Sequence, residues 1–406
     1  MKTQQLLALA ATLGASLMPP PCAGQARFDT IYKFGAYPDA QTPQGLVAGA
    51  NGALYGASSN GGIYGYGTVF ELQPPAAPGG GWIETVLYSF AQQNGDGVYP
   101  LAGLSMGPNG ALYGTTAAYD DYGTVYELQP PGPEGGSWTE TVLFRSTQSS
   151  NIQYLNNVIP GPNGEVYGVS DGAVYELAPP ATPGGAWTET VLYSFTGYPN
   201  GTSPEGLAIG ANGVIYGTTY QGGSSDGGTV FALTPPAVAG GPWTEAVLYS
   251  FSSSNGGALP TQPPVIGEGG AIYGTTSYSG SGNLGTAFRL TPPSSPGGSW
   301  TEAVLYNFGG AAVSSSPLIV RDGIVYGTTA TPASSGGEGG YVFELQPSAA
   351  PGGPWTEVVL HQFTGAEEPY GSLVMDRNGA LYGTTHRGPY GGVPPGGRGS
   401  VYRIRP

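Results

Sequence analysis

Short runs of apolar and β-branched residues alternate with glycine, proline and asparagine along almost the whole chain, and the pattern repeats. In the fourth repeat the apolar runs cover residues 206–210, 214–219, 229–233 and 243–251. Runs of this length, bounded by turn-forming residues, are typical of β-strands. Asn212-Gly213 joins the first two runs, and this dipeptide is the strongest short-range signal for a two-residue hairpin. The pattern therefore predicts units of four short antiparallel strands.

A Tyr-Gly pair marks the same place in every unit. The pairs are 49 to 58 residues apart, and a period of about 50 residues indicates a repeat architecture. They are Tyr55-Gly56, Tyr113-Gly114, Tyr167-Gly168, Tyr216-Gly217, Tyr273-Gly274, Tyr326-Gly327 and Tyr382-Gly383. The long crossovers that parallel pairing requires are absent. Seven such units predict an all-β fold, a seven-bladed β-propeller of four-stranded antiparallel blades.

The two ends of the chain predict how the ring closes. Residues 27–34 resemble the fourth strand of a unit, whereas residues 400–405 resemble a third strand that no fourth strand follows. We therefore expect the N-terminal strand to complete the last blade, which removes the exposed sheet edges of an open array. This predicts one domain over residues 27–406. Its blade repeats lie at about 44–90, 101–145, 155–195, 205–251, 262–308, 316–363 and 371–405 plus 27–34.

Composition narrows the class of protein. Glycine and proline are abundant (73 and 39 residues), but 28 tyrosines, 12 phenylalanines and 6 tryptophans argue against disorder. The net charge of −15 repels phosphate backbones, so we expect no nucleic-acid partner. No run of Lys or Arg favours an anionic membrane, and no apolar stretch is long enough for a transmembrane segment.

The first 26 residues predict a signal peptide. Lys2 supplies the positive charge, residues 6–18 form a short apolar region, and Gly24 and Ala26 are small residues suited to cleavage before Arg27. We therefore expect a secreted or periplasmic protein. Cys22 is the single cysteine. The alternative of lipidation there is disfavoured, because prolines precede it where lipoprotein signals carry leucine and small residues.

The whole repeat resembles a known family. Its motifs are Leu-Tyr-Gly-Thr-Thr, Gly-Thr-Val-Phe-Glu-Leu and Trp-Thr-Glu-x-Val-Leu-Tyr-Ser-Phe. Together they are similar to the Gloeobacter–Verrucomicrobia (GloVer) tandem repeat of exported bacterial choice-of-anchor tandem repeat proteins. The resemblance covers about residues 28–405. It implies an extracellular or envelope repeat protein and carries over no catalytic residue.

Variable loops supply the candidate binding residues. In an antiparallel meander, the second-to-third loops and the blade connections share one face, and function concentrates on variable loops over a rigid scaffold. Aromatic rings with a hydroxyl suit sugar or peptide surfaces. The candidates are Tyr64, Tyr66, Tyr119, Tyr122, Tyr220, Tyr278, His386, Arg387 and Tyr390. The alternative is that these rings only plug glycine-rich loops.

Carboxylates on the same face leave two further possibilities open. Calcium takes oxygen ligands, and the candidates for it are Asp96, Asp120, Asp121 and Asp226. Paired carboxylates can also hydrolyse glycosides, and further acids predicted on this face include Asp39, Glu205, Glu338, Glu367 and Glu368. The alternative is plain solvated loop charge. No other cofactor is expected.

These patterns favour a non-enzymatic, monomeric scaffold that binds a glycan, a peptide or an envelope protein through its variable face. One alternative is a polysaccharide hydrolase or lyase that uses loop carboxylates, tyrosines or His386. Another is a purely structural surface protein. The six tryptophans each begin a fourth strand, so we expect them to pack blades rather than bind ligand. Serine-hydrolase, NTPase and c-type haem motifs are absent.

Overall fold

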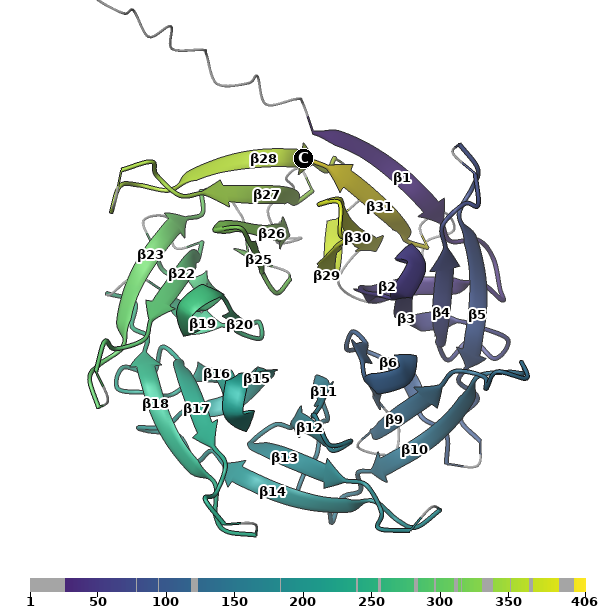
Figure 1. Ribbon diagram of the computed structural model, residues 1–406, viewed down its shortest axis with the longest axis horizontal. Helices are drawn as coiled ribbons and strands as arrows, with labels where there is room; N and C mark the ends of the chain where they lie inside the picture. The colour runs from purple at the N-terminus through teal and green to yellow at the C-terminus, as the bar shows by residue number, and fades with distance from the viewer. Residues whose placement is uncertain are drawn as a thin grey trace, which may run out of the picture.

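Seven blades form a ring in the computed structural model (Figure 1). The structure describes residues 26–77, 79–93, 95–117, 123–182, 184–238, 240–254, 257–280, 284–295, 297–309, 313–314, 316–330, 339–350, 352–364, 368–386 and 398–406. The predicted all-β propeller is confirmed. Within the described residues, no helix has the length and apolar character needed to cross a membrane.

Each blade is an antiparallel sheet that begins at the centre of the ring. Blade 1 holds β2 (Ala40–Ala48), β3 (Leu54–Gly61), β4 (Thr68–Gln73) and β5 (Ile83–Ser89). Blade 2 holds β6 (Val98–Pro100), β7 (Ser105–Met106), β8 (Leu112–Ala117), β9 (Thr124–Gln129) and β10 (Thr139–Arg145). Blade 3 holds β11 (Val158–Pro160), β12 (Val166–Val169), β13 (Ala173–Ala178) and β14 (Thr188–Ser194). Blade 4 holds β15 (Thr202–Ile209), β16 (Ile215–Gln221), β17 (Thr229–Thr234) and β18 (Thr244–Ser250).

The remaining blades follow the same plan. Blade 5 holds β19 (Ala258–Pro260), β20 (Val265–Ile266), β21 (Ile272–Tyr278), β22 (Thr286–Thr291) and β23 (Thr301–Asn307). Blade 6 holds β24 (Val313–Ser314), β25 (Ile319–Arg321), β26 (Ile324–Ala330), β27 (Tyr341–Gln346) and β28 (Thr356–Gln362). Blade 7 holds β29 (Glu368–Met375), β30 (Leu381–His386), β31 (Ser400–Arg405) and β1 (Arg27–Lys33).

The turn between the first two strands of a blade differs from the two-residue hairpin that Asn-Gly predicts. In blade 4 a short 3-10 turn covers Ala211–Gly213, and the Gly210 amide donates to the Val214 carbonyl across it. Asn212 has a φ of 66° and Gly213 a φ of 74°. Asparagine and glycine tolerate this left-handed conformation, so the dipeptide marks the turn correctly although the loop has three residues.

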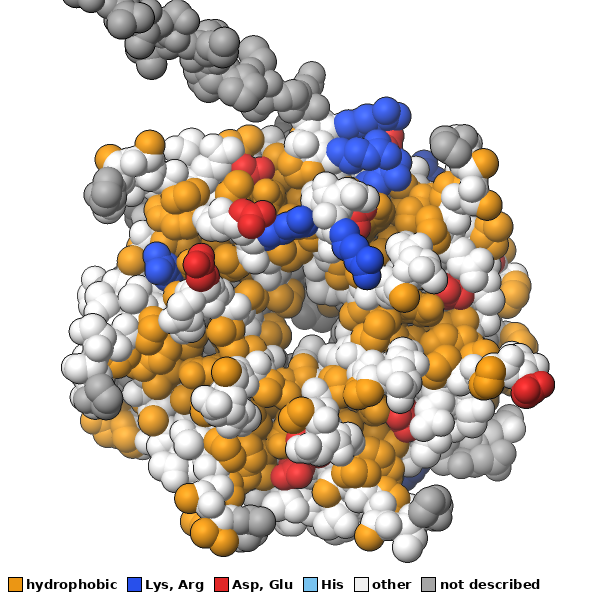
Figure 2. Space-filling model, in the orientation of Figure 1, with side chains coloured by type: hydrophobic (Ala, Val, Ile, Leu, Met, Phe, Trp, Pro, Cys, Tyr) orange, Lys and Arg blue, Asp and Glu red, His pale blue; other side chains and the backbone are white. Residues whose placement is uncertain are grey.

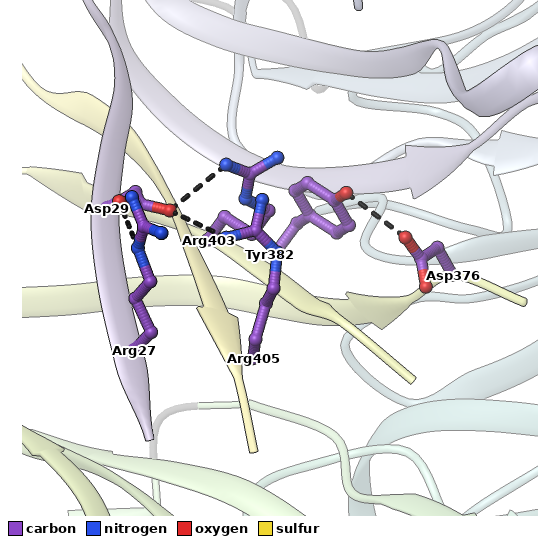
Figure 3. Close-up of polar contacts among 6 residues, drawn as sticks. All are labelled: Arg27, Asp29, Asp376, Tyr382, Arg403 and Arg405. Carbon is purple, nitrogen blue, oxygen red and sulfur yellow. Dashed lines mark hydrogen bonds and ion pairs between the residues drawn. The ribbon is translucent and has the colours of Figure 1, made fainter. Parts of the chain in front are cut away.

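The N-terminal strand closes the ring, as predicted. β1 pairs antiparallel with β31, from Arg27 opposite Arg405 to Lys33 opposite Ser400. Asp29 lies at the centre of the ion pairs shown in Figure 3, with Arg403 at 3.0 Å, Arg405 at 3.2 Å and Arg27 at 3.3 Å. The hydrogen bond from Arg403 lowers the pKa of Asp29. Basic side chains gather over this closing blade (Figure 2).

The glycine of each Tyr-Gly pair makes room for an aromatic ring of its own blade. A Cβ atom on Gly217 would lie 2.2 Å from the ring of Phe231, which is directly opposite on β17. A larger side chain is excluded at Gly217, because the ring of Phe231 occupies the position that the side chain would need. Phe231 is fully buried. Its ring also packs against Phe195 of the preceding blade, with ring centroids 4.9 Å apart.

Two contacts recur between blades. The tryptophan that begins a fourth strand packs on the Tyr-Gly tyrosine of the preceding blade, as Trp243 does on Tyr167 with ring centroids 6.0 Å apart. A fourth-strand tyrosine also donates to a glutamate of the next blade. The measured pairs are Tyr32 with Glu84 (3.0 Å), Tyr193 with Glu245 (3.5 Å) and Tyr306 with Glu357 (2.9 Å). The repeated Trp-Thr-Glu and Leu-Tyr-Ser-Phe motifs therefore join blades.

Candidate functional site

The predicted binding tyrosines have different environments. Tyr64 and Tyr278 are exposed, at 54% and 47% of their surface. Tyr66 is half-buried, because its ring packs edge-on against Tyr99 with centroids 5.7 Å apart. Tyr220 is half-buried near the end of β16. Tyr119, Tyr122, Arg387, Tyr390 and the side chain of His386 lie outside the described residues.

Three blade connections add exposed tyrosines. Tyr37 precedes blade 1, Tyr154 precedes blade 3 and Tyr198 precedes blade 4, and each is more than half exposed. Blade connections and second-to-third loops leave the same end of a blade. Tyr64 and Tyr278 therefore share one face of the disc with these three rings, and the exposed tyrosines are spread around its rim.

Each calcium candidate that the structure describes accepts a hydrogen bond from a backbone amide of its own loop. Asp96 accepts from the Ala91 amide at 2.7 Å, and Asp226 accepts from the Gly222 amide at 2.9 Å. These carboxylates come from different blades, and Asp120 and Asp121 lie outside the described residues. Across the described ranges, no three His, Cys, Asp or Glu residues are grouped as metal ligands.

An axial channel of about 480 Å³ runs through the centre of the ring, and every blade contributes to its wall. The hollow is visible at the centre of the disc in Figure 2. The wall combines side-chain amides, hydroxyls, one carboxyl and apolar groups. The residues that define this channel are Gln44, Leu46, Val47, Leu101, Ala102, Gly103, Leu104, Asn156, Asn157, Glu205, Thr261, Gln262, Pro263, Pro317, Tyr370, Gly371, Ser372, Leu373 and Val374.

Backbone bulges turn several of these side chains toward the axis. The register of the innermost strand shifts between Pro43 and Leu46 in blade 1 and between Pro204 and Gly206 in blade 4. A shift also follows Tyr370 in blade 7. Bulges re-aim the side chains of a strand and are frequent beside binding sites. Glu205 is the residue that the bulge of blade 4 presents to the channel, whereas Gln44 lines the wall with its side-chain amide donating to Thr42 and Ser59 of its own blade.

Sequence reasoning missed this convergence, although a signal for it exists. Three units carry a Pro-x-Gly segment at the same place, and the central residue differs each time. The segments are Pro43-Gln44-Gly45, Pro204-Glu205-Gly206 and Pro369-Tyr370-Gly371. Glu205 was expected on the variable face, as one of the carboxylates that could hydrolyse a glycoside or as solvated loop charge. A position that varies among otherwise similar units, next to a bulge-forming glycine, would have identified the channel.

Glu205 is the one carboxyl among the described channel residues, and no Lys or Arg lies beside it in the wall. Burial raises its pKa to about 7. Its carboxyl forms no hydrogen bond with the described residues. The Oγ1 atom of Thr261, in the same wall, is also buried without a hydrogen-bond partner there. The channel therefore presents polar groups that its own walls leave unsatisfied.

Comparisons with known proteins agree with the architecture. The model of the Gloeobacter/Verrucomicrobia repeat family matches residues 20–173, 170–330 and 239–406. A search of curated proteins found no match. Virginiamycin B lyase from Staphylococcus aureus is similar with a TM-score of 0.54 and 12% identity, over 93% of this chain and 99% of that chain. The extracellular domain of a candidate one component system from B. thetaiotaomicron is similar with a TM-score of 0.54 and 13% identity, over 92% of this chain and 39% of that chain. At these identities, the likeness shows the fold alone.

Proposed function

The chain belongs to the Gloeobacter/Verrucomicrobia repeat family, and we propose that it is an exported, non-enzymatic scaffold that binds a polysaccharide across its variable face. The observation that carries this proposal is the rim of exposed tyrosines. Tyr37, Tyr64, Tyr154, Tyr198 and Tyr278 all expose 47% or more of their surface. Export would use the signal peptide expected at residues 1–26.

Tyrosine suits this task for physical reasons. Its ring offers a large apolar surface, its hydroxyl both donates and accepts, and few torsions must be ordered on binding. A polysaccharide repeats its own surface, so tyrosines on several blades could engage one chain together. Linked weak contacts raise the overall affinity well above that of each contact.

The shortage of basic residues also favours a neutral polymer over an anionic one. The described carboxylates Asp96 and Asp226 each accept a backbone amide of their own loop. Proteins that bind anionic polymers need basic residues, and the chain has 11 Lys and Arg against 26 Asp and Glu.

The test is a binding assay of the purified protein with xylan, mixed-linkage β-glucan, dextran and pectin. A triple variant, Tyr64→Ala, Tyr198→Ala and Tyr278→Ala, should bind the preferred neutral polymer about tenfold more weakly, because exposed aromatic contacts dominate such surfaces. The matched control, Ile83→Ala with Val238→Ala, removes exposed apolar groups outside the variable loops and should bind normally.

Two results would contradict the proposal. Binding by the triple variant equal to that of the control would remove the rim from the site. Release of shortened sugars from the bound polymer would show catalysis, and the scaffold would then be an enzyme.

A further inference from the structure

We propose that the axial channel is a separate binding site for the end of a neutral saccharide chain, with Glu205 as its central hydrogen-bonding residue. This inference rests on the proposed function for its ligand class, but not for its location. The rim lies on the loops of one face, whereas the channel is lined by the innermost strands of blades 1, 4 and 7 and by segments beside the innermost strands of the other four blades.

Several residues of the channel wall differ from blade to blade, although the wall leucines Leu46, Leu104 and Leu373 repeat as the other structural positions do. Blade interfaces reuse tryptophan, tyrosine and glutamate at fixed places. At the channel, blade 1 presents Gln44, blade 2 Leu101, blade 4 Glu205 and blade 7 Tyr370. Packing of a symmetric ring would be met by similar residues in each blade. An asymmetric set of polar and apolar groups instead matches a ligand that has no sevenfold symmetry.

The polar groups of the wall select an uncharged ligand with many hydroxyls. Asn156, Asn157 and Gln262 provide side-chain amides, which both donate and accept, and Thr261 adds a hydroxyl. An anionic ligand would find no Lys or Arg among the described wall residues and would be repelled by Glu205 once ionised. The volume of about 480 Å³ falls within the range of about 300–1,000 Å³ usual for small-molecule sites.

Unsatisfied groups show where the ligand would bind most strongly. The carboxyl of Glu205 and the buried Oγ1 of Thr261 have no hydrogen bond within the described residues. Such groups carry a desolvation cost that a ligand hydroxyl can relieve. Leu101, which is 60% exposed, and Tyr370 provide apolar surface in the same wall for the C–H face of a sugar ring.

The carboxyl of Glu205 acts here as a hydrogen-bonding group rather than as a counter-ion. A single carboxylate could also hold an ammonium group. In that case its charge would be essential, whereas an amide could replace it in contacts with sugar hydroxyls. Glu205→Gln and Glu205→Leu therefore separate the two ligand classes.

The experiment is calorimetric titration of the purified protein with xylotriose, cellotriose and isomaltotriose. We expect at least one to bind, Glu205→Leu to weaken it about tenfold or more, and Glu205→Gln to weaken it by no more than about threefold. Glu134→Leu, at an exposed loop position away from the channel, is the matched control and should bind normally. Leu101→Trp narrows the channel from another blade and should also abolish binding; a thermal melt of each variant verifies that it folds.

Four results would overturn the inference. These are no binding of any trisaccharide, equal binding by Glu205→Leu and Glu134→Leu, equal loss in Glu205→Gln and Glu205→Leu, and normal binding by folded Leu101→Trp. Polymer binding distinguishes this failure from failure of the proposed function. If only the channel is wrong, the polymer still binds and still depends on the rim tyrosines. If only the rim is wrong, the trisaccharide still binds and still depends on Glu205.

Discussion

The blade interfaces and the axial channel are built from the same seven repeats, yet they use residues in opposite ways. At the interfaces the same side chains recur, as in the Tyr193–Glu245 and Tyr306–Glu357 hydrogen bonds. At the channel several blades present different side chains, such as Leu101, Glu205 and Tyr370, and the carboxyl of Glu205 is left without a partner in the described structure. Repeated positions are explained by packing, whereas the unlike positions need another explanation, which we assign to ligand binding.

Exceptions at the interfaces sharpen this contrast. In the fourth strand of blade 2, Phe144 occupies the position that Tyr193 holds in blade 3. It has no hydroxyl, so it cannot donate to Glu189 of blade 3. At the closing interface His361 takes the tyrosine position, and Phe28 takes the glutamate position. Their rings stack with centroids 3.6 Å apart. The polar contact is therefore replaced by another packing contact, so the interface still serves stability.

The closing strand should give the largest effect. Deletion of residues 27–34 removes β1, exposes the edge of β31 and leaves blade 7 incomplete. We expect the free energy of unfolding to fall by about 5 kcal/mol or more, which is comparable with the whole stability of a domain. We also expect aggregation through the open sheet edge. Size-exclusion chromatography and calorimetry measure this. A monomeric deletion variant with an unchanged melting temperature would refute ring closure as a source of stability.

Gly217→Ala should be the next most damaging change. The new methyl would lie 2.2 Å from the buried ring of Phe231, and overpacking of this kind costs about 1–3 kcal/mol. Gly81→Ala is the control, since no atom lies within 4 Å of its added Cβ. Chemical denaturation should separate the two variants. Equal stability would mean that the aromatic ring moves aside freely.

Tyr193→Phe tests one interface hydrogen bond. The change removes the hydroxyl that contacts Glu245 and Asn200, and a part-buried hydrogen bond contributes about 1 kcal/mol. Phe144→Tyr makes the reverse change at an interface that lacks the hydroxyl and should not destabilise the fold. Denaturation midpoints measure both changes. If Tyr193→Phe and Phe144→Tyr had equal effects, the recurring tyrosines would act only through their rings.

The interface between blades 1 and 2 should respond to pH. Burial, and secondarily Asp96, raises the pKa of Glu140 to about 7, although Arg145 opposes this. The folded state therefore binds more protons than the unfolded state between about pH 4.5 and 7, so stability falls as pH rises through this window. Glu140→Gln should reduce the slope of melting temperature against pH over this range, whereas exposed Glu134→Gln should leave the slope unchanged. Identical slopes for both variants would exclude Glu140 as the source.

The smallest effect should come from the channel wall. Leu101→Ser changes a side chain that is 60% exposed, and substitutions away from packed positions usually stay within about 0.5 kcal/mol. Its melting temperature should match that of the wild type. A loss as large as that of Gly217→Ala would mean that the wall residues stabilise the ring, and the contrast between interface and channel would disappear.

Much of the architecture could be predicted from local pattern. Asn212-Gly213 marks a turn, and Gly217 with its neighbours marks a second strand, because turn chemistry and strand periodicity act over a few residues. The candidate site was harder to predict. Tyr64 and Tyr278 are exposed as expected, whereas Tyr66 is packed against Tyr99 in the first strand of the following blade, a contact that its own loop does not reveal.

By itself, the amino-acid sequence determined the repeat, the strand order and the closing role of residues 27–34, since each depends on short motifs that recur at fixed spacing. Only the tertiary structure decided which of the variable residues meet. Gln44, Glu205 and Tyr370 come from units that are far apart in the chain, and they reach one channel because the ring closes and bulges turn them inward. Periodicity specifies each blade, but a shared axis exists only after all seven have assembled.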